Sequence, residues 1–153
     1  MALKLRIAAG ECIVINGALI RAESKAEIVL MNRANFMVDR QIMRPEQANS
    51  PARRIYFSLQ NAYLADPEER PRMREFFDTY TQQFFDATGS TTVRNAIAEM
   101  RERVAQNEFY TALQISRELI QYEDSVLQLA TLAGSGAART AGGGNGRGTP
   151  AKA

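Results

Sequence analysis

The residues of this chain best suited to chemistry are the lysines and arginines near its N-terminus, and their chemistry is anion binding. Lys4 and Arg6 alternate with apolar residues, Arg21 follows a turn, and Arg40 and Arg44 come after a later apolar run. Such cations bind phosphates, and arginine also donates to exposed base edges. Two interpretations stay open: these side chains solvate and protect a sheet, or they form a surface for nucleic acid.

The charges of the chain are unevenly distributed. Residues 3–54 hold nine basic and five acidic side chains, residues 55–132 hold seven and twelve, and residues 133–153 hold three basic side chains and no acidic one. The net charge of +2 therefore conceals a positive part and a negative part. This asymmetry predicts an anionic partner for the first part and another kind of partner for the second.

Catalysis is disfavoured by composition. The chain has no histidine and one cysteine, so it can form neither a Ser–His or Cys–His pair nor a zinc site of thiolates and imidazoles. The densest acidic cluster, Asp66, Glu68 and Glu69, lies beside two prolines, where a solvated turn is expected. We predict that the protein is not an enzyme and has no catalytic residue, metal site or cofactor.

The compartment predicted from the sequence is the cytoplasm. The single Cys12 suits a reducing environment, and its apolar neighbours predict a buried strand residue. No stretch approaches the roughly 18 apolar residues of a membrane helix, and the N-terminus lacks the apolar core of a signal peptide. No contact with a membrane is expected.

Residues 1–46 are predicted to form a β module that carries the basic side chains. Leu3 to Ile7 alternate between apolar and basic, which is typical of a strand with one buried face. Asn16-Gly17 is a strong signal for a type I′ hairpin. Further runs at 12–15, 18–22, 26–31 and 36–38, with 39–43 finishing the segment, predict five short strands in a meander or small barrel.

Residues 47–132 are predicted to form a helical module of about four helices, and residues 133–153 a disordered tail rich in glycine and alanine. Ser50 supplies a capping hydroxyl directly before Pro51, which suits the first helical position. The predicted helices are 51–65, one that begins at Pro71, one capped by Thr91 or Thr92, and one at about 107–131. The fold class is therefore α+β, with a small antiparallel sheet or barrel-like module before the helices.

The last predicted helix carries a heptad-like apolar seam, which is the candidate face for a protein partner. A second apolar stripe lies beside it, so that much of the helix circumference is apolar. Such a helix either lies centrally in its own bundle or docks on another chain, and both alternatives stay open. The seam consists of Ala112, Ile115, Leu119, Tyr122, Val126 and Leu129.

Several short motifs together resemble the FlbT family, which comprises flagellar-biosynthesis regulators of alphaproteobacteria. The motifs are Leu3-Lys4-Leu5, Gly10-Glu11, Ile15-Asn16-Gly17-Ala18, Ile20-Arg21, Met43-Arg44-Pro45-Glu46 and Ser50-Pro51-Ala52-Arg53-Arg54-Ile55-Tyr56-Phe57. The likeness covers about residues 3–131. It implies a post-transcriptional regulator that binds the 5′ untranslated region of flagellin mRNA and alters its translation or decay, usually in repression. It also implies a small protein partner, FlaF.

A fainter resemblance is to the carbon storage regulator CsrA, a strand-swapped β dimer that binds GGA-containing loops in mRNA. The segment Val38-Asp39-Arg40-Gln41-Ile42 is similar to one of its motifs, although Asp39 replaces a histidine and Ala8-Ala9 replace two arginines. The resemblance implies that Leu5 and Arg6 lie on an RNA-contacting first strand and Arg40 on the opposing edge.

Taken together, these observations favour an RNA-binding regulator. The alternative is a helical adaptor or chaperone-like protein that binds flagellin or a FlaF-like partner without touching RNA. The number of subunits stays open, including a homo-oligomer. The candidate RNA-binding residues are Lys4, Leu5, Arg6, Arg21, Arg40 and Arg44.

Overall fold

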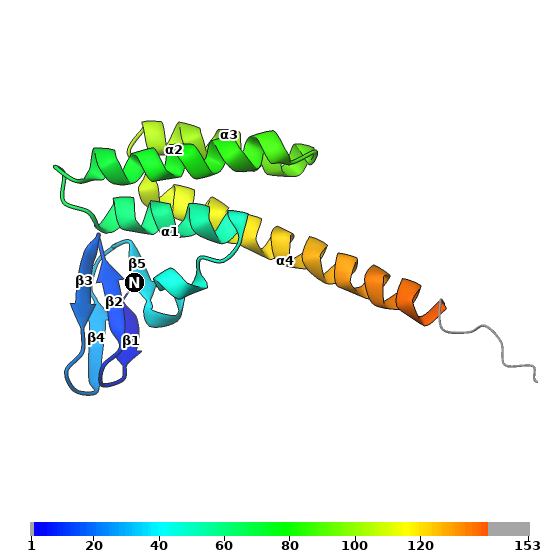
Figure 1. Ribbon diagram of the computed structural model, residues 1–153. Helices are drawn as coiled ribbons and strands as arrows, with labels where there is room; N and C mark the ends of the chain where they lie inside the picture. Colours follow the sequence, from blue (N-terminus) through cyan, green and yellow to red (C-terminus); the bar gives the residue numbers. More distant parts are fainter. Residues whose placement is uncertain (1, 141–153) are drawn as a thin grey trace, which may run out of the picture. The chain divides into compact units, whose positions relative to one another are not determined.

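The computed structural model describes the backbone of residues 2–140 and the side chains up to residue 134 (Figure 1). The chain divides into two compact units, the first being Met1–Ile120 and the second beginning at Gln121. The strands are β1 (Leu3–Ile7), β2 (Cys12–Ile15), β3 (Ala18–Arg21), β4 (Ala26–Leu30) and β5 (Phe36–Val38). Two 3₁₀ helices, η1 (Asp39–Gln41) and η2 (Pro45–Gln47), precede α1 (Pro51–Leu64), α2 (Arg70–Ala87), α3 (Thr91–Ala105) and α4 (Phe109–Thr140).

The five predicted strands are present, but they do not form a meander. β1 pairs with β4 in one antiparallel sheet, and β3, β2 and β5 form a second antiparallel sheet in that order. The predicted α+β class, with small antiparallel sheets before four helices, is confirmed. Of the two arrangements expected for the strands, a meander or a small barrel, the meander is wrong, because two of the three pairings join strands distant in sequence. Asn16 and Gly17 have φ values of 48° and 86°, so the predicted hairpin turn between β2 and β3 is confirmed.

The segment after β5 leaves the sheet and turns into η1. The Asp39 carboxylate accepts a hydrogen bond of 2.8 Å from the backbone N–H of Cys12, and the Gln41 side chain accepts one of 3.0 Å from the N–H of Val38. These bonds fix the chain where residues 39–43 were expected to finish the β segment. Cys12, predicted to be buried, is half-buried on β2.

The four predicted helices are present and differ from the prediction only at their ends. Ser50 caps α1 as predicted, its hydroxyl accepting from the N–H of Arg53 at 3.2 Å. The cap of α3 is Ser90 rather than either threonine, because its hydroxyl reaches the N–H of Val93 at 3.3 Å. The last helix, α4, continues to Thr140, so the part of the predicted tail before residue 141 is helical. The remainder of that prediction, residues 141–153, lies outside the described residues.

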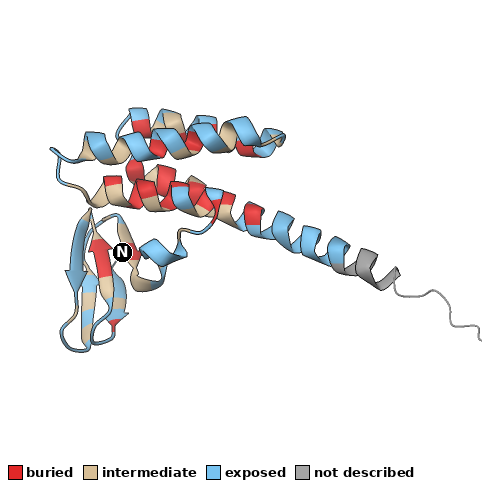
Figure 2. Ribbon diagram, in the orientation of Figure 1, coloured by how far each residue is buried: buried red, intermediate tan, exposed pale blue. Residues whose placement is uncertain are grey.

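One hydrophobic core serves both the strands and the helices of the first unit (Figure 2). Val14 of β2 and Met37 of β5 belong to the same buried cluster as residues of all four helices. The Gln60 side chain of α1 also bonds the backbone N–H and carbonyl of Met43, at 2.7 and 2.8 Å. The predicted β module of residues 1–46 therefore shares its core with the helices of the first unit.

Candidate nucleic-acid interface

Two predicted cations, Lys4 and Arg6, lie on the exposed face of β1 and share one carboxylate. The Lys4 ammonium is 3.0 Å from Glu27 of β4, and Nε of Arg6 is 3.1 Å from its other oxygen. The Arg6 side chain remains 75% exposed. Leu5 is half-buried opposite Ile28, and strand alternation places it on the other face of the sheet. The exposed face of β1 thus carries two cations and one neighbouring anion.

The structure brings Arg6 and Arg40 together. Both line a hollow of about 290 Å³ whose other lining residues are Glu11, Val38 and Asp39. The two carboxylates are already engaged, Asp39 with the N–H of Cys12 and Glu11 with the N–H of Ala8 at 3.0 Å. Arg40 is exposed and forms no ion pair with any residue that the structure describes. This hollow, which we call the strand hollow, therefore presents two guanidinium groups to solvent.

The other two predicted cations stand apart from the strand hollow. Arg21 is exposed at the end of β3, opposite Cys12 of β2. Arg44 is exposed immediately before η2, and its backbone N–H donates to the Gln47 side chain at 2.8 Å. The structure thus unites two of the five predicted cations in one hollow and joins Lys4 to them through the shared Glu27.

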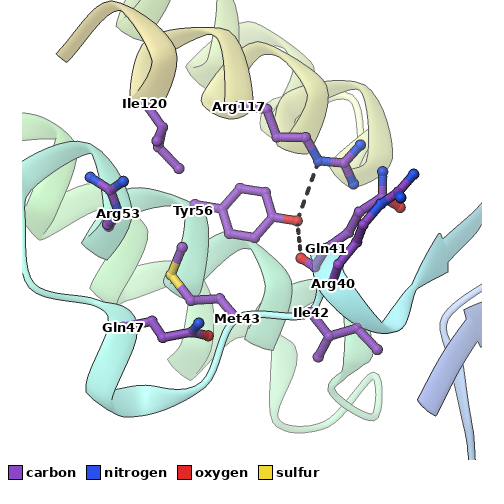
Figure 3. A pocket seen from close by; sticks show the side chains of 9 residues that line it. All are labelled: Arg40, Gln41, Ile42, Met43, Gln47, Arg53, Tyr56, Arg117 and Ile120. Carbon is purple, nitrogen blue, oxygen red and sulfur yellow. Dashed lines mark hydrogen bonds between the residues drawn. The ribbon is translucent and has the colours of Figure 1, made fainter. Parts of the chain in front are cut away.

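A second hollow, of about 370 Å³, lies between the η1 segment, α1 and the first-unit part of α4 (Figure 3). We call it the arginine pocket, because three arginines and no acidic residue line it. Its lining residues are Arg40, Gln41, Ile42, Met43, Gln47, Arg53, Tyr56, Arg117 and Ile120. Arg40 therefore lines both hollows, and the arginine pocket lies beside the predicted site within the same unit.

The phenol of Tyr56 fixes Arg117 at this pocket. It donates to the backbone carbonyl of Gln41 at 2.5 Å and accepts from Nε of Arg117 at 3.3 Å (Figure 3). The guanidinium carbon also lies 5.8 Å from the centre of the Tyr56 ring, within the range of a cation–π interaction. Burial raises the pKa of Tyr56, and the hydrogen bond from Arg117 opposes that rise. The phenol therefore stays neutral at physiological pH, where it can both donate and accept.

One nitrogen of Arg117 is left without a partner. Its Nη2 is shielded from solvent and makes no hydrogen bond with any residue that the structure describes. A buried polar atom without a partner costs about 1–3 kcal/mol, and more if charged. Arg53 also lines the pocket but is engaged in another interaction. This nitrogen is shielded, so the feature that would favour an anion is the acid-free lining of the hollow with its arginine side chains.

The helical residues that line the arginine pocket were not among the predicted site residues. Arg53 gave a weak signal, because a basic side chain in the first turn of a helix opposes the helix dipole. Tyr56 lay within the quoted motif without an assigned role. Arg117 gave no local signal, since its contact with Tyr56 joins residues 61 positions apart.

The predicted protein-partner face is divided by the fold. Ala112 and Leu119 are buried in the core of the first unit, and Ile115 is packed against it. Their assignment to an exposed docking face is therefore corrected, because the first turns of α4 complete the protein's own core. The other three residues, Tyr122, Val126 and Leu129, are exposed by 37%, 46% and 66%.

Among the described residues, no group of three or more acidic, cysteine or histidine side chains is arranged to hold a metal ion. The acidic turn between α1 and α2, with Asp66, Glu68 and Glu69, is exposed. None of the helices in the described part of the chain combines the length and apolar character needed to cross a membrane.

Fold and site together define a small α+β protein whose β module and helices share one core and present arginines around two adjacent hollows. The chain belongs to the FlbT family: the family model, described as flagellar protein FlbT, matches residues 3–127. This confirms the family suggested by the sequence motifs. The family is regulatory and non-enzymatic, as the sequence analysis predicted.

Curated relatives of this family align with most of the chain. The chain is 35% identical over 128 residues to the flagellum biosynthesis repressor protein FlbT of Caulobacter vibrioides, covering 83% of this chain and 90% of the relative. It is 36% identical to the probable repressor of a Caulobacter species, strain K31, with 83% and 97% covered. It is 31% identical over 136 residues to that of Brucella anthropi, with 84% and 89% covered. No solved structure matches the chain significantly.

Proposed function

We propose that this protein represses flagellum biosynthesis by binding the 5′ untranslated region of flagellin mRNA in the cytoplasm and altering its translation or decay. Two kinds of support exist. The chain belongs to the FlbT family, and its curated relatives carry the name of flagellum biosynthesis repressor. The observation that carries the RNA-binding part is the convergence of Arg6 and Arg40, from segments far apart in sequence, on the strand hollow.

The chemistry of this surface favours phosphates and base edges over stacking. Lys4, Arg6 and Arg40 are exposed cations that donate to phosphate oxygens or to exposed bases. The only aromatic residue of the β module is Phe36, which is half-buried. Base stacking on an aromatic platform, as in many single-strand binders, is therefore not the mode that this surface offers. Repression needs no catalysis, because a protein bound to the leader blocks ribosomes or changes access of nucleases.

The double variant Arg6→Ala/Arg40→Ala tests the proposal. We expect its affinity for a flagellin leader RNA to fall at least tenfold, because two charge-assisted contacts of about 1.5–3 kcal/mol each are lost. The matched control is Arg54→Ala/Arg72→Ala, which removes two exposed helical arginines outside both hollows. Fluorescence anisotropy across a range of salt concentrations measures both affinity and the number of phosphates engaged. Equal affinities of the two folded double variants would reject the proposed surface.

A second candidate function is favoured by the exposed apolar side chains of the second unit. Val126, Leu127 and Leu129 are each between 46% and 66% exposed on α4. Apolar exposure of this kind is typical of a helix that docks on another protein. The alternative is therefore an adaptor that binds flagellin or a FlaF-like protein and reaches RNA only through it. A stoichiometric protein that remains bound after nuclease and high salt would favour the adaptor, whereas nuclease-sensitive absorbance at 260 nm would favour direct RNA binding.

A further inference from the structure

The arginine pocket has the composition of an anion site. Its three arginines are accompanied by two glutamines, and none of its nine lining residues is acidic. Like charges gathered without carboxylates raise the local positive potential and attract anions. By contrast, the strand hollow contains two carboxylates beside its two arginines. The arginine pocket is therefore the hollow whose lining contains arginines and no carboxylate, although Arg53 is engaged in another interaction.

Arg117 is positioned in this pocket before any ligand arrives. Tyr56 accepts from its Nε and lies against its guanidinium group, and the backbone carbonyl of Gln41 holds the Tyr56 phenol in turn. Arg117 has no ion pair with a described residue, and its Nη2 is buried without a partner. A guanidinium held by Tyr56 in this way has already lost side-chain freedom, so an anion that binds it does so at a smaller entropic cost.

Arg40 supplies a second guanidinium and connects the pocket to the strand hollow. In Figure 3, Arg40 and Arg117 extend on the same side of Tyr56, and Arg53 lies on the other side. Arginine presents its donors in a planar fork that matches the oxygens of a phosphate. Because Arg40 lines both hollows, Arg6, Arg40 and Arg117 form a continuous series of cations from β1 to α4.

We infer that the arginine pocket is a phosphate subsite in which Arg117 and Arg40 bind one phosphate group of the RNA backbone. This inference rests on the proposed function and extends it, because it assigns part of the RNA-binding surface to the helices. The strand hollow then contacts the adjacent stretch of RNA through Arg6. The shared chemistry is a phosphate group, and a small free phosphate is the other source that the test must distinguish.

The test compares Arg117→Gln and Arg117→Lys with the control Arg101→Gln. Arg101 resembles Arg117 in its contacts: it makes one side-chain hydrogen bond, to Gln82 at 3.0 Å, and its guanidinium carbon lies 5.5 Å from the ring centre of Phe85. Unlike Arg117, it lies outside the arginine pocket. We expect Arg117→Gln to weaken binding of a flagellin leader RNA at least fivefold and to reduce the salt slope by about one phosphate. Arg117→Lys should fall between it and the wild type, because it keeps the charge and loses the fork. Arg101→Gln should leave affinity unchanged.

A second arm uses inorganic phosphate alone as the probe. Millimolar phosphate should raise the thermal unfolding temperature of the wild type and of Arg101→Gln more than that of Arg117→Gln. Because phosphate stabilises all three proteins in a general way, only the difference between them reports binding in the pocket. Leader binding that depends on Arg6 and Arg40 but is equal in Arg117→Gln and Arg101→Gln overturns the inference and leaves the proposed function intact. If the wild type binds no RNA but phosphate still protects it in a way that depends on Arg117, the proposed function is overturned. The ligand of the pocket is then a small free phosphate and not a phosphate group of RNA. Absence of both effects overturns the inference outright.

Discussion

Removing the negative charge of Glu27 should strengthen RNA binding. Glu27 is the carboxylate shared by Lys4 and Arg6, at 3.0 and 3.1 Å. An RNA phosphate that contacts Arg6 must approach Glu27 to within about 4–6 Å, where two unit charges in water repel each other by about 0.7–1 kcal/mol. Glu27→Gln removes this repulsion and releases both cations from their competing partner. We therefore expect affinity for the leader to increase about three- to sixfold.

The cost to the fold should be small. All three side chains are about half exposed or more, and exposed ion pairs stabilise proteins by about 0.2–1 kcal/mol. The free energy of unfolding of Glu27→Gln should thus fall by about 1 kcal/mol or less. The control is Glu23→Gln, which changes the net charge equally at an exposed position between β3 and β4 where no ion pair is formed with a described residue. Denaturant titration and anisotropy at low salt provide both measurements. Leader binding by Glu27→Gln that is no tighter than binding by Glu23→Gln would show that Glu27 does not compete with RNA for Lys4 and Arg6.

Three further predictions concern the scaffold. Gly17→Ala should lower the free energy of unfolding by about 1–3 kcal/mol in denaturant titration. The reason is that φ at this position is +86° and the added carbon would lie 3.3 Å from the backbone oxygen of Tyr63. An unchanged denaturation midpoint would contradict the turn geometry. Gln60→Ala should cost about 2–4 kcal/mol of unfolding free energy, because the buried amide bonds both backbone groups of Met43, and a loss below 1 kcal/mol would show that this link is weak. Burial raises the pKa of Tyr56 above its ordinary value of 10.0. The free energy of unfolding should therefore fall as pH rises beyond 10, because the Tyr56 phenol ionises in the unfolded chain first. Tyr56→Phe should show a shallower fall of stability with pH, and an equal fall would argue against burial of the phenol as the cause.

The parts of the fold predicted correctly from sequence are those determined by local chemistry. The alternation in β1, the Asn16-Gly17 turn and the Ser50 cap each depend on residues within a few positions of one another. The pairing of β1 with β4 depends instead on how strands distant in sequence meet, and alternation alone cannot specify that partner. The meander prediction failed for this reason.

The candidate site likewise contains residues that could be predicted from the local sequence and residues that depend on contacts between distant segments. Arg6 and Arg40 could be identified from their charge and the resemblance of their motifs, although only the fold places them on one hollow. The arginine pocket depends on a contact between α1 and α4, so Arg117 could not be distinguished from an ordinary surface arginine. The heptad-like spacing of α4 predicted a single face for a protein partner. In the structure, Ala112 and Leu119 of that face are buried in the core, whereas Leu129 is exposed. Periodicity identifies which residues share a face but not what covers it.

The proposed function requires that the arginines of the first unit bind flagellin messages. Crosslinking of the tagged full-length protein to RNA in motile cells, followed by sequencing of the bound fragments, tests it most directly. We expect enrichment of a flagellin 5′ untranslated region with the wild-type protein and loss of that enrichment with Arg6→Ala/Arg40→Ala. Recovery of flagellin leaders no more often than other transcripts of equal length and abundance would contradict it.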